Sequence, residues 1–231
     1  MNTDRIVIKK KLDEFPNAGT FFQKISGIDV NHIPEQYGDD VTDAQNMLKE
    51  HAEIVIIYKV CEIEAINENE VVLEGGKTLS GQMPPMILKD SRKLVSCVIS
   101  LQGFTEASEQ SDDIMIEYFM DSWGSAYVEC AQAWLGKHMK EELAKEGLKR
   151  THLWSPGQHR FELTNQRTLF DILRPEEEGC MLTESYMMVP VKSGSGIWGV
   201  IDESIENVLL PCDFCTLGAT CPSSKRGCAE L

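Results

Sequence analysis

The stretch DDIMIEYFMDSWGSAYVECAQAWL, residues 112–135, decides the fold class, because it carries the strongest helical periodicity in the chain. Its large apolar side chains recur every three or four residues, which places them on one helical face: Phe119, Trp123, Tyr127, Cys130 and Trp134. This stripe predicts a helix over about residues 112–150 whose aromatic face packs in the core. Ser111 is the expected N-cap, and Gly136 or Gly147 would divide the helix into two pieces.

Segments rich in Val and Ile lie on both sides of this helix and predict strands. We expect strands at 5–9, 53–63, 71–73 and 94–101 before the helix, and at 181–191 and 196–202 after it. Thr42 and Gln45 match a capping box, which would open a short helix. A further helix is expected at 164–173, capped by Thr164. Strands, then helices, then strands again favour an α+β fold over alternating βαβ units.

The composition describes a folded and strongly acidic chain. Its 231 residues include 22 basic and 37 acidic side chains, which gives a net charge of −15 at pH 7. This length suits one large domain or two small ones. The acidity argues against duplex DNA or an anionic membrane as the main partner, because both would repel the chain. There is no apolar run of membrane-spanning length and no signal-peptide region, so we expect a cytoplasmic protein that binds neither nucleic acid nor membrane.

The eight cysteines fall into two groups. Four are scattered among apolar neighbours and are expected to be small buried hydrophobes: Cys61, Cys97, Cys130 and Cys180. The other four crowd near the carboxyl end and predict a metal site: Cys212, Cys215, Cys221 and Cys228. A Cys-x-x-Cys pair with two further thiolates can complete a tetrahedral zinc set, and four sulfurs can also hold an iron–sulfur cluster. Spacing alone does not choose between these metals or exclude a metal-free tail.

The glycines at 194, 196 and 199 formally match the dinucleotide fingerprint GxGxxG. That motif works only where a strand precedes it and a helix begins at it, so that a pyrophosphate meets the helix N-terminus. Here the sequence continues as IWGVID, which is typical of a strand. We therefore expect no dinucleotide site, and a flexible loop close to a ligand backbone remains an open alternative ahead of the strand.

Two short motifs later in the chain are candidates for ligand contact. Trp154-Ser-Pro156-Gly157 predicts a tight turn before a helix. Glu184 and Ser185, in the motif Leu-Thr-Glu-Ser, fall in an apolar strand context, where a carboxylate needs a reason to be present. The residues alone leave two interpretations open, a buried capping network and a carboxylate that faces a ligand.

The order of these motifs resembles the activation domain of cobalamin-dependent methionine synthase, and above all the stand-alone proteins of anaerobic bacteria that carry this domain. The similar features are a Pro-Gly turn, a helix, Leu-Thr-Glu-Ser, and then a proline with a Ser-x-Ser-Gly segment. Asp121-Ser-Trp-Gly124-Ser-Ala-Tyr-Val-Glu129 resembles the aspartate, glycine and glutamate helix of the stand-alone members. The strand at 98–103 is similar as well, so the resemblance covers about residues 30–205.

This resemblance implies a curved α+β domain with a twisted antiparallel sheet and packed helices. In that family the domain binds S-adenosylmethionine and returns an inactive cobalt(II) corrinoid to methylcobalamin, with one electron and one methyl group. The corrinoid-binding motif is missing here, so the implied partner is a separate corrinoid-binding protein or methyltransferase. The implied ligand-binding residues orient rather than catalyse: Glu129, Pro156, Gly157, Glu184 and Ser185. No catalytic acid, base or nucleophile is expected.

Three positions depart from the family pattern. Leu153 and Gln158 stand where the methionine synthase domain has the arginine and tyrosine of its Arg-x-x-Pro-Gly-Tyr motif, and Ser125 replaces a helix glutamate. Leucine cannot make the paired charge-assisted hydrogen bonds that arginine gives a carboxylate. The departures favour an alternative, a non-catalytic corrinoid-protein chaperone or adaptor. A third possibility is a small iron–sulfur electron carrier that works through its tail.

The chain is expected to have three regions. Residues 1–110 would form an N-terminal α+β region, and residues 111–205 the activation-domain-like core of helices and strands. Residues 206–231 would form the cysteine-rich tail, which lies outside the resemblance. An iron–sulfur cluster on this tail would supply the low-potential electron that cobalt(II) reduction needs.

Overall fold

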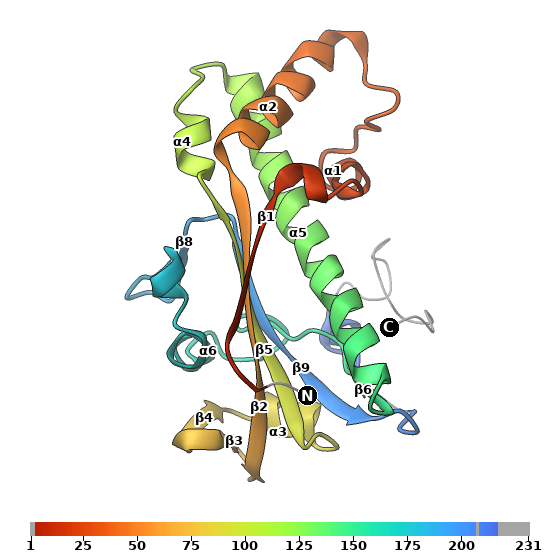
Figure 1. Ribbon diagram of the computed structural model, residues 1–231, viewed down its shortest axis with the longest axis vertical. Helices are drawn as coiled ribbons and strands as arrows, with labels where there is room; N and C mark the ends of the chain where they lie inside the picture. Colours follow the sequence, from red (N-terminus) through yellow and green to blue (C-terminus); the bar gives the residue numbers. More distant parts are fainter. Residues whose placement is uncertain (1–2, 207, 217–231) are drawn as a thin grey trace.

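Antiparallel strands run along the centre of an elongated molecule, with helices on both faces (Figure 1). The computed structural model describes residues 3–206 and 208–216. The strands are β1 (Ile6–Lys11), β2 (Glu53–Ile66), β3 (Glu70–Leu73), β4 (Lys77–Ser80), β5 (Lys93–Gln102), β6 (Leu148–Arg150), β7 (Met181–Leu182), β8 (Met188–Val189) and β9 (Ser193–Asp202). The α-helices are α1 (Ala18–Ser26), α2 (Gly38–His51), α3 (Met83–Leu88), α4 (Phe104–Ser108), α5 (Ile114–Ala144) and α6 (Asn165–Leu173). Short 3-10 helices lie at Leu12–Glu14, Glu35–Tyr37, Glu74–Gly76, Pro175–Glu178 and Pro211–Phe214.

The large sheet has the strand order β4-β3-β2-β5-β9-β6, and β1 pairs with β2 beside β3. One edge of β2 pairs with β1 along its first half and with β3 along its second half. The other edge of β2 pairs with β5. Its side chains alternate between two buried faces. Ile54 and Ile56 face α5, whereas Val55 and Ile57 face α6, which explains why the strand reads as one continuous apolar run.

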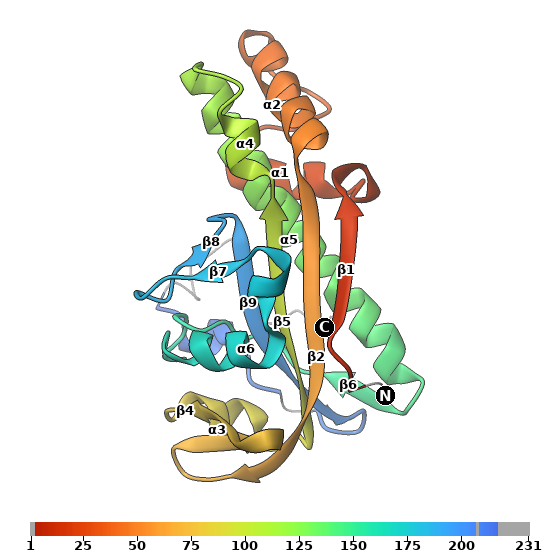
Figure 2. The ribbon, with the colours of Figure 1, turned by 60° about the vertical axis from the view of Figure 1, so that its left-hand side comes forward.

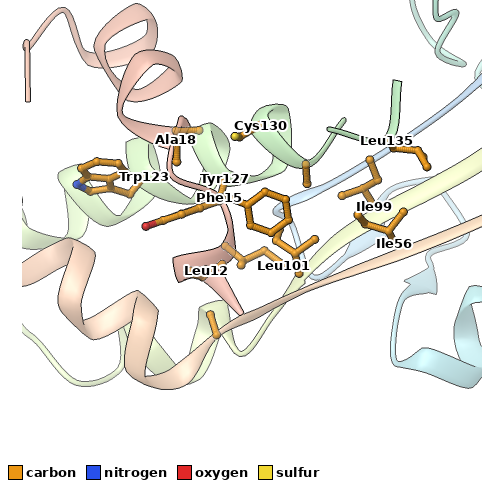
Figure 3. Close-up of a cluster of buried hydrophobic side chains, with 14 of the residues drawn as sticks. Leu12, Phe15, Ala18, Ile56, Ile99, Leu101, Trp123, Tyr127, Cys130 and Leu135 are labelled. Atoms are coloured by element: carbon orange, nitrogen blue, oxygen red, sulfur yellow. The ribbon is translucent and has the colours of Figure 1, made fainter. Parts of the chain in front are cut away.

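The aromatic stripe of α5 covers one face of the sheet. Trp123 stacks on Phe22 of α1 with ring centroids 4.1 Å apart, and its indole N–H donates to the Val41 carbonyl at 3.1 Å. In Figure 3, Leu135 of α5 lies next to the strand residues Ile99 and Ile56. Four of the five predicted stripe residues are buried, and Trp134 is half-buried. The helix therefore joins α1, α2 and the sheet into one core.

The opposite face of the sheet is covered by α6 and by the segment that precedes it (Figure 2). Phe170 on α6 packs with Val55 and Val98 of the sheet. Trp154 and Phe161 pack with other residues of the same face in a second cluster. The four scattered cysteines are buried, as expected from their apolar neighbours.

Three predictions about the helices are corrected by the structure. The predicted capping box does not open α2, because the helix begins at Gly38 and the Thr42 hydroxyl donates to the Gly38 carbonyl from within it. The N-cap of α5 is Asp113 rather than Ser111, since the Asp113 carboxylate accepts from the Met115 N–H. Gly136 does not divide α5. It leaves room for Arg150, whose Nε donates to the Gly136 carbonyl at 2.8 Å.

Two predictions about the last strands are also corrected. The segment 181–191 is not one strand, because β7 and β8 form a separate two-stranded sheet joined by a turn. Glu184 and Ser185 lie in that turn and are exposed, so the apolar strand context predicted for them is wrong. β9 begins at Ser193, three residues before the predicted start at Gly196, so Gly194 lies in the strand rather than in a loop ahead of it.

The helices carry too many polar side chains to be membrane spans. Within residues 3–206 and 208–216, no helix combines the length and the apolar character that crossing a membrane requires. α5 is 31 residues long, yet its outer side exposes charged groups such as Glu117, Asp121 and Glu129. Its length serves packing along the sheet instead.

Two glycines with the same backbone conformation give a test of this packing. Gly103 has φ +80° and a Cβ there would lie 2.0 Å from the His51 carbonyl oxygen, whereas Gly27 has φ +78° and no atom within 4 Å. Both alanine variants strain a left-handed residue by about 1–2 kcal/mol. We expect Gly103→Ala to lose a further ~1–3 kcal/mol from overpacking. Urea unfolding followed by tryptophan fluorescence measures both, and equal losses would contradict the close approach of α4 to α2.

Candidate functional site

The predicted ligand-binding residues lie on three different elements. Glu129 is exposed on α5, and Pro156 and Gly157 form a turn after β6. Glu184 and Ser185 lie at the exposed tip between β7 and β8. Within the described residues, their side chains make no hydrogen bond or ion pair with α5 or with the turn, and Ser185 contacts only Thr183 nearby. The first two elements approach β9, through Val128 of α5 and through Trp154 ahead of the turn.

The Pro-Gly turn has the predicted tight geometry. Gly157 has φ +86°, which favours glycine, and its N–H donates to the Phe161 carbonyl at 2.7 Å. Trp154 and Phe161 on either side are 2% and 1% exposed. These two anchors hold the turn against the sheet while Gly157 itself remains exposed.

Within the described residues, the outer edge of β9 has no paired strand along residues 193–196, of which Ser195 and Gly196 are buried. Ile197 exchanges both backbone hydrogen bonds with Trp154, at 3.0 and 2.9 Å. Alternate residues of an antiparallel strand direct their N–H and C=O to the same side, so Ser193 and Ser195 direct theirs to this edge. β6 pairs only with residues 200–202.

Glycines leave the α5 side of this edge without side chains. A Cβ on Gly196 would lie 2.7 Å from Leu153 Cδ1, so Leu153 approaches only because residue 196 is glycine. The nearest atom to a Cβ on Gly194 is Val128 Cγ1 at 3.7 Å, so a methyl group would fit there. We call Val128, Leu153 and the strand segment 193–196 the β9 edge site. Glu129 follows Val128 in the helix.

Lys192 directly precedes this edge and was missed by sequence reasoning. Its Nζ lies 2.6 Å from Asp121 Oδ1 and donates to Ser125 Oγ at 2.9 Å. The lysine side chain is 11% exposed, whereas that of Asp121 is 68% exposed. The sequence does contain one signal that could have pointed to Lys192. Lys192 is the only basic residue between Arg174 and Lys225, an isolated cation in an acidic stretch.

A shallow hollow lies between α4 and α5, next to Asp121, which pairs with this lysine. It measures about 480 Å³ and is lined by Phe104, Ser108, Ile114, Glu117, Tyr118 and Asp121. The Lys192 Nζ lies 5.6 Å from the centroid of the Phe104 ring. Gly124 allows this crossing, since a Cβ there would lie 2.9 Å from Phe104 Cε2 and 3.2 Å from Lys192 Cγ.

Comparison with known proteins gives a result for the structure but none for the sequence. No protein-family model and no curated protein matches the chain. Among solved structures, the crystal structure of the MetH reactivation domain bound to AdoHcy superposes with a TM-score of 0.62. The match covers 90% of this chain and 81% of that chain, at 11% sequence identity. The chain has the fold of the MetH reactivation domain. The predicted α+β fold and the resemblance to an activation domain are confirmed.

In this reactivation-domain fold, the described residues of the β9 edge site offer groups that can bind a ligand rather than a nucleophile. Cys97 pairs with Gly196 in the sheet, but burial raises the pKa of its thiol to about 12. A thiol of that pKa is not a nucleophile at neutral pH, because the thiolate is the reactive form. The available groups are backbone N–H and C=O, a fixed ammonium and exposed carboxylates.

The first tail cysteines lie close to the Pro-Gly turn. Cys212 is in the 3-10 helix Pro211–Phe214, and the N–H of Cys215 donates to the Cys212 carbonyl at 3.3 Å. The Phe214 ring packs on Trp154 with centroids 5.7 Å apart. The start of the tail is thus attached to the residue that bridges to β9.

The predicted metal site is described only in part. Cys221 and Cys228 lie outside the described residues. Within the described ranges, no three potential ligands from His, Cys, Asp and Glu lie together. Cys212 and Cys215, in a Cys-x-x-Cys turn, suit one edge of a tetrahedral sulfur set. The metal site therefore stays a prediction.

Thiol reactivity tests the contrast between the tail and the body. In metal-free protein at pH 8, we expect iodoacetamide to label Cys212 and Cys215 well before Cys61 and Cys97. Burial raises the pKa of both body thiols to about 12, so they remain protonated and shielded. Peptide mapping by mass spectrometry gives the rates, with urea-unfolded protein as the control. Equal rates in the folded protein would contradict the burial of the body cysteines.

Proposed function

We propose that this chain takes part in the reductive reactivation of a corrinoid carried by a partner protein. The observation that carries the proposal is the reactivation-domain fold together with the β9 edge site, where Val128 of α5 and Leu153, ahead of the Pro-Gly turn, approach β9. The neighbour of this fold was crystallised with AdoHcy, the demethylated product of S-adenosylmethionine. A ligand of that class is proposed for the β9 edge site.

The proposed reaction needs little from the protein except positioning. One electron reduces cobalt(II) to cobalt(I), which attacks the methyl carbon of S-adenosylmethionine and forms methylcobalt and S-adenosylhomocysteine. The cobalt is the nucleophile, so the chain's residues bind and orient the methyl donor. This matches a site without a reactive thiol.

The proposed roles follow the positions of the residues. Glu129 and the Pro156-Gly157 turn flank the β9 edge site and are proposed to bind the ligand. Glu184 and Ser185 are proposed as ligand contacts from the exposed hairpin tip, which requires the ligand or the partner to reach that tip. The partner is proposed to be a corrinoid-binding protein or a methyltransferase that carries the corrinoid.

A second candidate function is a non-catalytic adaptor for a corrinoid protein. It is favoured by Leu153, which packs against Gly196 where the related domains have an arginine. Gln158 replaces the tyrosine of the same motif. An adaptor would keep the fold and the docking function but not the methyl donor. A third candidate, an electron carrier, depends on the tail cysteines.

Isothermal calorimetry with S-adenosylmethionine separates reactivation from the adaptor function. We expect the parent protein to bind, and Gly194→Ala to bind about tenfold more weakly, because the added methyl group overfills the ligand contact. The methyl group fits the protein itself, since its nearest neighbour lies at 3.7 Å. Gly38→Ala is the matched control, with no atom within 4 Å. No heat from the parent at millimolar ligand would favour the adaptor.

The tail is tested by its metal content and its redox effect. An iron–sulfur cluster on the four tail cysteines would supply single electrons, whereas zinc has no redox chemistry. Protein purified without oxygen should be brown, and Cys212→Ser with Cys215→Ser should lose iron and sulfide but keep its melting temperature. With free cob(II)alamin and a low-potential reductant, the double variant should also reduce cobalt more slowly, as followed by visible absorption. If the parent is colourless and binds one equivalent of zinc, the tail has a structural role and delivers no electron.

A further inference from the structure

Lys192 holds a positive charge in a fixed place next to the β9 edge site. Its stem lies over Gly124 of α5, with Lys192 Cγ 3.2 Å from the position of a Cβ on that residue. Asp121 and Ser125 take two of the three N–H groups of its ammonium. In the described residues, no third acceptor lies within hydrogen-bond distance. One donor is therefore left for a ligand.

Lys192 is a cation among acidic residues, so its ammonium group is where an anionic ligand would be attracted. The sequence has no basic residue between Lys93 and Lys137, a stretch that contains β5, α4 and the first half of α5. The same half of α5 exposes Glu117, Asp121 and Glu129. Carboxylates in such an acidic field repel a ligand carboxylate unless a cation lies close by.

The Lys192–Asp121 pair matches the charged end of an α-amino acid. An ammonium group can donate to Asp121, which is 68% exposed, while a carboxylate accepts from Lys192. Leu153, on the other flank of the edge, offers no charge. Asp121 also lines the shallow hollow between α4 and α5, so its carboxylate is accessible from solvent.

We propose that Lys192 anchors the carboxylate of an α-amino-acid-bearing nucleoside at the β9 edge site, and so determines which ligands this chain binds. The inference rests on the proposed function for the ligand class and adds the residue that selects it. Arg160, exposed in the Pro-Gly turn region with φ +65°, is the rival cation. Lys192 is favoured because its position is fixed by two side-chain contacts.

Three ligands that differ in their amino-acid part test the proposal. Calorimetry is run with S-adenosylmethionine, S-adenosylhomocysteine and 5′-methylthioadenosine, which lacks the amino-acid carboxylate. Lys192→Met keeps the stem that packs on Gly124 and removes the charge, and Lys192→Arg restores a cation. Lys137→Met, on the same helix as Asp121 but 79% exposed in the parent, is the matched control. Arg160→Gln tests the rival.

We expect Lys192→Met to bind the two ligands that carry a carboxylate about 10- to 100-fold more weakly, the usual effect of losing a hydrogen bond to a charged group. Its affinity for 5′-methylthioadenosine should not change, and Lys192→Arg should recover most of the loss. Lys137→Met and Arg160→Gln should behave as the parent does.

Other outcomes overturn the proposal. An equal loss for all three ligands would mean that Lys192 only supports the fold, and unchanged or tighter binding of S-adenosylmethionine would mean that it does not anchor the carboxylate. A loss confined to Arg160→Gln would transfer the role to the turn. If the parent binds none of the ligands, the anchor is wrong, while cobalt reduction with cob(II)alamin still decides the corrinoid role by its own readout.

Discussion

The aromatic face of α5 packs on β2, β5 and β9, and the remaining elements take their positions from that contact. The helix has 31 residues, about 46 Å at the rise of an α-helix, so it spans most of the sheet. Trp123 is locked between α1 and α2 by a ring stack and an indole hydrogen bond. With the buried face fixed in this way, Asp121 and Ser125 are turned toward the start of β9. One helical register thus sets both the core and the polar part of the site.

The fold was largely predictable because its signals are local. Periodic aromatic residues identified α5, and dense Val and Ile identified β2 and β5, since burial of a face imposes these patterns on neighbouring residues. Helix starts were less predictable. Thr42 has the pattern of a cap, but α2 begins one turn earlier.

In the candidate site, a short motif predicted the local geometry of one turn, and the ligand-binding roles stay predictions. The Pro156-Gly157 turn was recognisable because its geometry depends on those two residues alone. The contact between Lys192 and Ser125 joins positions 67 residues apart, and no short pattern reports such a pair. Glu184 was placed in a strand because its neighbours are apolar, yet Met181, Met187 and Val189 are exposed on the hairpin, so hydrophobicity did not indicate burial there.

The unpaired edges of β1 and β9 differ in the side chains that another strand would meet. In the described residues β1 pairs with β2 alone, and Lys9, Lys10 and Lys11 follow one another along this edge strand, with side chains that alternate between the two faces of the sheet. Charged side chains along a free edge discourage another copy from adding a strand, which protects against aggregation. The early part of β9 has no such guard, because residues 193–196 are serines and glycines. An extended segment from another polypeptide would therefore meet lysine side chains along β1, but only the partly exposed Ser193 and Gly194 at the start of β9.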